Sequence, residues 1–196
     1  MSEELLKQVI AKIDAALAQD PNLMEIDGQQ RPVAVVQAEK RSAWVEKLAG
    51  KTVSEELQIA ARAQHIRRWE IPRDNYPRDR IGYLKWRTDL QQFHAAKTAE
   101  IMREAGYGEA AISRVKALIT KKRLKQDREV QILEDALCLV FLETQFSEFA
   151  QNESDKITNI LQKTWKKMSP QGQQLALQLP LNDTDRAIID GALGDI

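Results

Sequence analysis

The chain has 196 residues, and its 29 Lys or Arg balance its 29 Asp or Glu, so bulk charge favours neither a nucleic acid nor a membrane surface as partner. Apolar residues make up 43% and charged residues 30%, as in ordinary soluble domains. A single cysteine, Cys138, excludes an internal disulfide framework and a cysteine-based zinc site. The N-terminus is charged, and no apolar run is long enough to span a bilayer, so we expect a cytoplasmic protein with no membrane partner.

Apolar residues recur with helical period along nearly the whole chain, which predicts an all-α protein. The first helix is expected over residues 3–17, and the second begins near Pro32 and runs to residue 48. The stretch "QDPNLMEIDGQQ" between them is rich in Pro, Asn, Asp and Gly and is interpreted as a loop.

The middle of the chain predicts two helices separated by a rigid loop. Thr52, with Glu55 three residues later, forms a capping box for a third helix that extends through His65. The loop "WEIPRDNYPRDR" contains two prolines that interrupt the helical pattern. A long fourth helix follows over residues 80–105, and Gly106 ends it.

The remaining pattern predicts five more helices. A short fifth helix occupies "GEAAISRVKALITKK", and Asp127 caps a sixth over residues 129–150, which we expect to be the most buried. Three more helices are expected over residues 154–168, 170–179 (capped by Ser169) and 183–193. We interpret residues 1–196 as one compact multi-helix domain, with a core over about 35–150 and helices 153–193 packed on it.

Two adjacent carboxylates, Glu134 and Asp135, lie in the apolar sixth helix, where both cannot face water. A buried carboxylate must be protonated, hydrogen-bonded, paired with a cation or bound to a metal. The chain has two histidines, His65 and His94, and with Asp135 they could form a His/His/Asp metal site. No local spacing supports that site. The alternative is that a carboxylate accepts hydrogen bonds from a buried His or Arg and fixes helix packing.

The neutral net charge of the whole chain conceals a basic segment in its middle. Residues 62–97 contain nine Lys or Arg against four Asp or Glu, and a second basic cluster, "KKRLK", covers residues 121–125. Aromatic side chains are interleaved with these cations, which suits a nucleotide, another phosphorylated small molecule or an exposed RNA element. The alternative is a solvated basic face that pairs with the acidic C-terminal helices. The candidate phosphate-binding residues are Arg67, Arg68, Arg73, Arg80, Arg87, Lys121 and Lys122.

The stretches "LQIAARAQHI", "FHAAKTAEIMREAGYGEAAISRVKALITKKR" and "ILEDALCLVFLE" resemble, in that order, the helical core of the HD-domain phosphohydrolases over about residues 35–145. At finer scale, "AARAQHIRRWEIPR", "YLKWRTDLQQFHA", "LEDALCLVFLE" and "KTWKKMSP" resemble the bacterial and fungal family called domain of unknown function 4202, over nearly the whole chain.

The HD resemblance implies a divalent metal held by His65, His94 and Asp135, with Glu134 or Asp135 as the catalytic carboxylate that orients water. The implied function is a metal-dependent phosphohydrolase acting on a nucleotide or other phosphorylated small molecule. The alternative is a non-catalytic module that binds a phosphorylated ligand, RNA or a protein partner through the basic surface around His65.

Three positions depart from the HD pattern. Ile66 stands where the aspartate of the His-Asp pair is expected, and Ala38 where an upstream histidine is expected. The pair of lysines at 121 and 122 replaces a later histidine. A full two-metal site therefore cannot be built, which leaves a one-metal site or a scaffold that has lost its metal.

Overall fold

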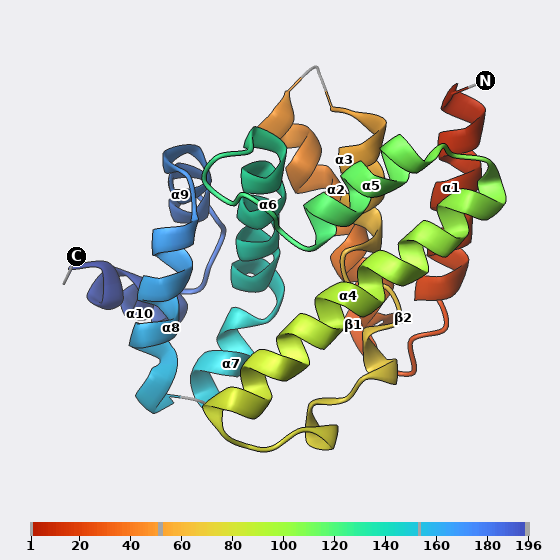
Figure 1. Cartoon of the computed structure of the whole chain (residues 1–196). Helices are drawn as coiled ribbons and strands as arrows, with labels where there is room; N and C mark the ends of the chain where they lie inside the picture. The colour runs from red at the N-terminus through yellow and green to blue at the C-terminus, as the bar shows by residue number, and fades with distance from the viewer. Residues whose placement is uncertain (1, 51–52, 153, 195–196) are drawn as a thin grey trace.

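The structure, a computed structural model, describes residues 2–50, 53–152 and 154–194, and within them it is mainly helical (Figure 1). The elements are α1 (Ser2–Leu17), β1 (Leu23–Ile26), β2 (Gln29–Pro32), α2 (Val33–Ala49), α3 (Glu55–Ala63), the 3-10 turns η1 (Arg68–Glu70) and η2 (Arg73–Asn75), α4 (Arg80–Ala105), α5 (Glu109–Ile119), α6 (Arg128–Thr144), α7 (Phe146–Asn152), α8 (Ser154–Lys167), α9 (Pro170–Leu177) and α10 (Asp183–Gly194). The all-α prediction is confirmed. No helix in the described ranges is both long and apolar enough to cross a bilayer.

The segment predicted as a loop before α2 contains a small antiparallel hairpin, so that prediction was wrong in part. Ile26 of β1 pairs with Gln29 of β2, and the two residues between them, Asp27 and Gly28, both have positive φ angles, 50° and 76°. Asp-Gly with both residues left-handed is the preferred two-residue hairpin turn, because its twist matches that of the strands. The Asp-Gly signal was present in the sequence.

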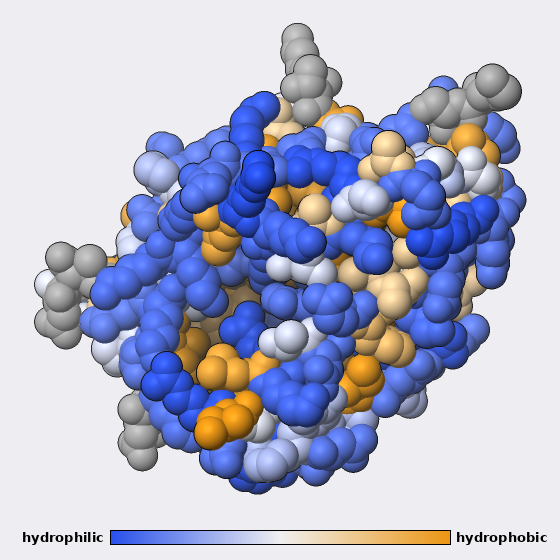
Figure 2. Space-filling view, in the orientation of Figure 1, coloured by the Kyte–Doolittle hydropathy of each residue, from blue (hydrophilic) through white to orange (hydrophobic). Residues whose placement is uncertain are grey.

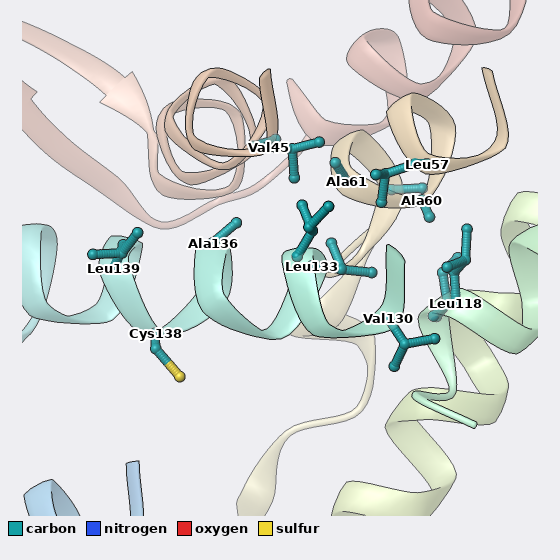
Figure 3. Close-up of a cluster of buried hydrophobic side chains, with 14 of the residues drawn as sticks. Val45, Leu57, Ala60, Ala61, Leu118, Val130, Leu133, Ala136, Cys138 and Leu139 are labelled. Atoms are coloured by element: carbon teal, nitrogen blue, oxygen red, sulfur yellow. The ribbon is translucent and has the colours of Figure 1, made fainter. Parts of the chain in front are cut away.

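Helix α6 forms the centre of the molecule, and ten of its seventeen residues are buried, as predicted. Asp127 caps it by accepting hydrogen bonds from the backbone N–H groups of Glu129 and Val130. Figure 3 shows that Leu133 and Ala136 point toward side chains of α2 and α3, whereas Cys138 points away from that cluster. The helix ends at Thr144 rather than at residue 150, and α7 begins two residues later.

Helix α3 is shorter than predicted and does not contain His65. It ends at Ala63, and Arg67 in the following turn has a φ of 53°, a left-handed value that a continuing helix cannot contain. Its N-cap is Ser54, whose hydroxyl accepts from the Leu57 N–H, and the predicted cap Thr52 lies outside the described residues. The turn after α3 therefore places His65 outside the α-helix, and Arg68 begins the 3-10 turn η1.

The C-terminal helices cover the side of α6 opposite to α2 (Figure 1). Helices α8 and α9 both contact α6, and α10 packs on α8 and α7. Ser169 caps α9 with Pro170 at its first position, as predicted. The long helix α4 packs on α1, α3 and α5, and residues of its N-terminal half and of α6 line the same cavity.

Candidate functional site

A cavity of about 280 Å³, here called the central cavity, opens between the N-terminal half of α4 and helices α6 and α8. Figure 2 shows the surface hollowed there, with hydrophilic residues inside the hollow. Its walls are Gln37 and Arg41 from α2; Gln64, His65 and Arg68 after α3; Tyr83, Trp86, Arg87, Leu90, Gln91 and His94 from α4; Lys121; Leu137, Cys138, Val140 and Phe141 from α6; Gln145; and Thr164 and Lys167 from α8.

Arg41 is the most unusual residue of the central cavity, because it is a buried cation that pairs with no carboxylate of the described residues. Its side chain is 1% exposed. Its Nε donates to the Ala61 carbonyl, while one terminal nitrogen is buried with no hydrogen-bond partner in the described ranges. Burial, and to a smaller extent the charge of Arg62, lowers the pKa of Arg41 to about 9, so it is still charged at neutral pH. An unsatisfied buried charge is costly and marks a site that a ligand can complete.

Four further cations line the same cavity. The guanidinium of Arg68 lies 4.8 Å from the centre of the Trp86 ring, and that of Arg87 lies 5.8 Å from the Tyr83 ring. Neither pairs with a carboxylate within the described ranges, and desolvation followed by repulsion from Arg87 lowers the pKa of Arg68. The remaining two are Lys121 and Lys167.

Glu134 is the carboxylate that balances this charge in part. One oxygen lies 2.5 Å from Nζ of Lys121 and the other 3.9 Å from Nζ of Lys167. Burial alone would raise the pKa of Glu134, but these lysines outweigh it and lower the pKa, so the group is ionised. Five cations and one carboxylate give the central cavity a strongly positive balance.

Two neutral histidines complete the wall. The rings of His65 and His94 have centroids 5.8 Å apart. Nδ1 of His94 lies 2.8 Å from the Ile66 carbonyl, which can only accept, so Nδ1 donates and Nε2 has a free lone pair. Nε2 of His94 and Nδ1 of His65 are both buried and have no hydrogen-bond partner in the part of the chain that the structure describes.

The pKa values of both histidines are lowered. Burial, followed by the charges of Arg68 and Arg41, lowers the pKa of His94 to about 4 against the hydrogen bond to Ile66, which raises it. Burial, then Arg41 and Arg68, lowers the pKa of His65 well below its usual value. Both imidazoles are therefore uncharged at neutral pH and can accept a proton or bind a metal.

Asp135 does not join His65 and His94. Its oxygens accept hydrogen bonds from the Ser169 N–H (2.9 Å), the Ser169 hydroxyl (2.5 Å) and the Gln131 amide (2.9 Å), all on the side of α9. No group of three or more His, Cys, Asp or Glu in the part of the chain that the structure describes could hold a metal ion. The expected three-ligand constellation is therefore not assembled, because Asp135 and Glu134 point to different partners on neighbouring faces of α6.

The predicted phosphate-binding residues divide into two groups. Arg68, Arg87 and Lys121 line the central cavity. Arg67 pairs with Glu70, and Arg73 donates to the carbonyls of the loop before α4. Arg80 and Lys122 are exposed and line no described cavity.

Sequence analysis missed Arg41 and Lys167 as cavity residues. A signal for Arg41 existed, since it interrupts the apolar stripe of α2 formed by Ala34, Ala38, Val45 and Leu48, all buried. A lone cation on the core face of a helix needs a partner, and the sequence pattern was not used to predict one for Arg41. No comparable signal marks Lys167, because its approach to Glu134 depends on how α8 packs against α6.

Two of the residues with left-handed backbone lie at or beside this site. Arg67 and Lys121 have φ angles of 53° and 55°, in the left-handed region that costs a residue with a side chain about 1–2 kcal/mol. The first precedes Arg68, and the second is itself a cavity cation. Strained residues of this kind are concentrated at binding sites, where the surrounding fold holds them in place.

Comparison with known proteins finds one family. Neither the curated proteins nor the solved structures contain a match to this chain. The sequence model of domain of unknown function 4202 (DUF4202) matches residues 7–189, which is nearly the whole chain. The chain therefore belongs to the DUF4202 family.

Proposed function

We propose that this protein binds a phosphorylated small molecule in the central cavity, with the phosphate group among Arg41, Arg68 and Arg87. The observation that carries the proposal is the buried guanidinium of Arg41, which among the described residues has no carboxylate partner and one unsatisfied terminal nitrogen. Arginine presents paired N–H donors that match phosphate oxygens, and such bonds are strongest away from water. The small volume of the central cavity, about 280 Å³, favours a small ligand over RNA or a protein.

The charge balance supports the same ligand. A phosphate monoester carries nearly two negative charges at neutral pH, and the central cavity has five cations against Glu134. Binding would relieve repulsion among the cations and supply the missing partner of Arg41. The apo protein therefore maintains a destabilised site whose free energy is recovered when the ligand binds.

Hydrolysis of the bound phosphate ester is the second candidate function, and the free lone pair on Nε2 of His94 favours it. In such a reaction a water oxygen attacks phosphorus, its proton passes to Nε2, and the ester oxygen leaves with its electron pair. The HD-like helical arrangement expected from the sequence would also agree with hydrolysis. The divalent metal expected with it lacks its carboxylate ligand, since both Asp135 oxygens are hydrogen-bonded elsewhere.

Binding can be tested by calorimetry and thermal unfolding with inorganic phosphate, pyrophosphate and phosphorylated metabolites. Arg41→Met keeps the length of the side chain and removes its charge. We expect the variant to remain folded and to lose at least tenfold in affinity for every ligand that binds the wild type. An unchanged affinity would overturn the proposal.

Arg114→Met is the matched control for this variant. The Arg114 guanidinium pairs with Asp127 and Glu129 outside the cavity. Its loss should lower stability by roughly 1–2 kcal/mol without changing the ligand-induced rise in melting temperature. Arg41→Met should therefore lose phosphate affinity while remaining folded, whereas Arg114→Met should lose stability while keeping its phosphate affinity.

A second pair of variants separates backbone strain from charge. Lys121 and Arg123 both have left-handed φ angles, 55° and 62°, but only Lys121 lines the cavity. Glycine at either position relieves strain. We expect only Lys121→Gly to weaken phosphate binding. Equal effects of the two variants would show that the site does not use the Lys121 charge.

A further inference from the structure

A second cavity, here called the side cavity, adjoins the central one. It has a volume of about 520 Å³, and His65, Arg68 and Trp86 lie in the walls of both. Small-molecule sites range from about 300 to 1,000 Å³, so the side cavity can accept a group much larger than a phosphate. A ligand with its phosphate in the central cavity can extend past Arg68 into this space.

The side cavity has an aromatic wall that is already fixed in position. The indole N–H of Trp86 donates to the Ile71 carbonyl at 2.9 Å, and Arg68 covers one face of the ring. Trp69, on η1, also lines the side cavity and is half-buried. Its ring packs in part against the hydrophobic core, and among the described residues it makes no aromatic or cation–π contact and its indole N–H makes no hydrogen bond. Trp69 is thus available to stack against a ligand.

Uncommitted amide groups lie in the same wall. Gln37 belongs to both cavities and makes no side-chain hydrogen bond within the described ranges. Asn22 uses its amide N–H₂ on Asp20, which leaves its carbonyl oxygen as an acceptor. Asp20 itself is fully engaged, since it also accepts from the backbone of Asn22 and Ala34. These groups offer both donors and acceptors beside an aromatic face.

We propose that the ligand is a nucleotide, with its base in the side cavity against Trp69 and its phosphate in the central cavity. This inference rests on the proposed function. A heteroaromatic base has a flat face for stacking and an edge of donors and acceptors that the amides of Gln37 and Asn22 can read. Stacking of a base on an aromatic side chain contributes enough to change affinity by about tenfold or more. A simple sugar phosphate would leave the tryptophan face and the amides unused.

The test compares three ligands by calorimetry: a nucleoside 5′-monophosphate, ribose 5-phosphate and inorganic phosphate. We expect the nucleotide to bind at least tenfold tighter than ribose 5-phosphate, and to quench tryptophan fluorescence. Adenine and uracil nucleotides are both assayed, since the base is not specified. If ribose 5-phosphate binds as tightly as both nucleotides, the inference fails and the proposed phosphate site stands; if no phosphate ligand binds, both fail.

Trp69→Leu tests the base contact directly. It should reduce nucleotide affinity about tenfold and leave the affinity for ribose 5-phosphate and inorganic phosphate unchanged. Trp44→Leu is the matched control, because Trp44 contacts Glu143 and Lys47 and lines neither cavity. Its nucleotide affinity should equal that of the wild type. Equal nucleotide affinity of Trp69→Leu and the wild type would overturn the inference even if the nucleotide binds.

Discussion

Neighbouring residues of this chain have opposite roles, as Glu134 and Asp135 show. Both are buried, at 4% and 1% exposure, yet one faces the lysines of the central cavity and the other faces the start of α9. The difference follows from the rotation of about 100° between successive helical residues. Glu134 therefore belongs with the ligand site, whereas Asp135 stabilises the packing of two helices.

This difference predicts different outcomes for Glu134→Gln and Asp135→Asn. Removing the Glu134 charge leaves Lys121 in a protein interior without its carboxylate, which should cost about 3 kcal/mol of unfolding free energy. The freed lysine should then bind phosphate more tightly than in the wild type. Asp135→Asn should cost roughly 1–3 kcal/mol through its lost acceptors, with no change in phosphate affinity. Urea unfolding and phosphate calorimetry on both variants check this, and the reverse pattern of affinities would refute it.

At the scale of elements, α9 is fastened to α6 by a close contact at its first turn. The Ser169 hydroxyl accepts from the Gly172 N–H and donates to Asp135. A Cβ atom added at Gly172 would lie 2.7 Å from the Asp135 carboxyl carbon, which is closer than real Cβ atoms come. Glycine at this position allows the short helix to sit directly on Asp135, the carboxylate that accepts hydrogen bonds from its cap, Ser169.

We therefore expect Gly172→Ala to destabilise the protein by about 1–3 kcal/mol, the usual cost of forcing an extra methyl group into a packed site. Gly191, inside α10, has open space around its position for a Cβ atom. Gly191→Ala should stabilise by about 0.5–1 kcal/mol, because alanine loses less backbone entropy in a helix. Thermal unfolding of both variants measures the contrast, and a stabilised Gly172→Ala protein would contradict this account of α9.

At the scale of the whole molecule, the cavity exists because α4 and α6 are held apart. Residues from four helices, from the turns after α3 and α5 and from the junction at Gln145 meet there, and they are separated by up to 130 positions in the sequence, from Gln37 to Lys167. The same arrangement encloses two uncharged histidines among cations. Folding therefore keeps both imidazoles uncharged, whereas acid favours their protonated form.

This predicts a loss of stability in mild acid. The folded pKa of His94 is about 4 and its unfolded pKa about 6.5, so between these values the unfolded chain binds more protons. The contribution of uncharged His94 to the free energy of unfolding is fully present above pH 6.5 and is lost as pH falls toward 4. The loss is roughly 3 kcal/mol at most. His65 is lowered in the same direction and adds to the loss.

Urea unfolding between pH 7 and pH 4, in buffers without phosphate, measures the effect. His94→Gln should show a shallower decline than the wild type, because glutamine does not titrate. Asp127, whose pKa is lowered to about 2 chiefly by its hydrogen bonds to Arg114, contributes only at the acid end of this range. Parallel curves for the two proteins would show that His94 does not titrate in this way.

Most of the helical framework could be predicted because its signals are local. Gly106, Asp127, Ser169 and Pro170 end or begin helices through contacts with their own neighbours, and periodicity identified the buried α6. The same locality explains the errors. The end of α3 at Ala63 and the break at Gln145 depend on packing rather than on a cap or a proline, and the Asp-Gly hairpin turn was present in the sequence but was interpreted as loop.

The sequence by itself determined the helical class, the family, the proximity of basic and aromatic residues around His65, and the need of Glu134 and Asp135 for buried partners. Tertiary structure alone decided which partners they have: Lys121 for the first and Ser169 for the second. It also brought Arg41 and Lys167 to the same cavity. The physical reason is that a side chain's helix face is fixed by local rotation, whereas the group it meets depends on how distant helices pack.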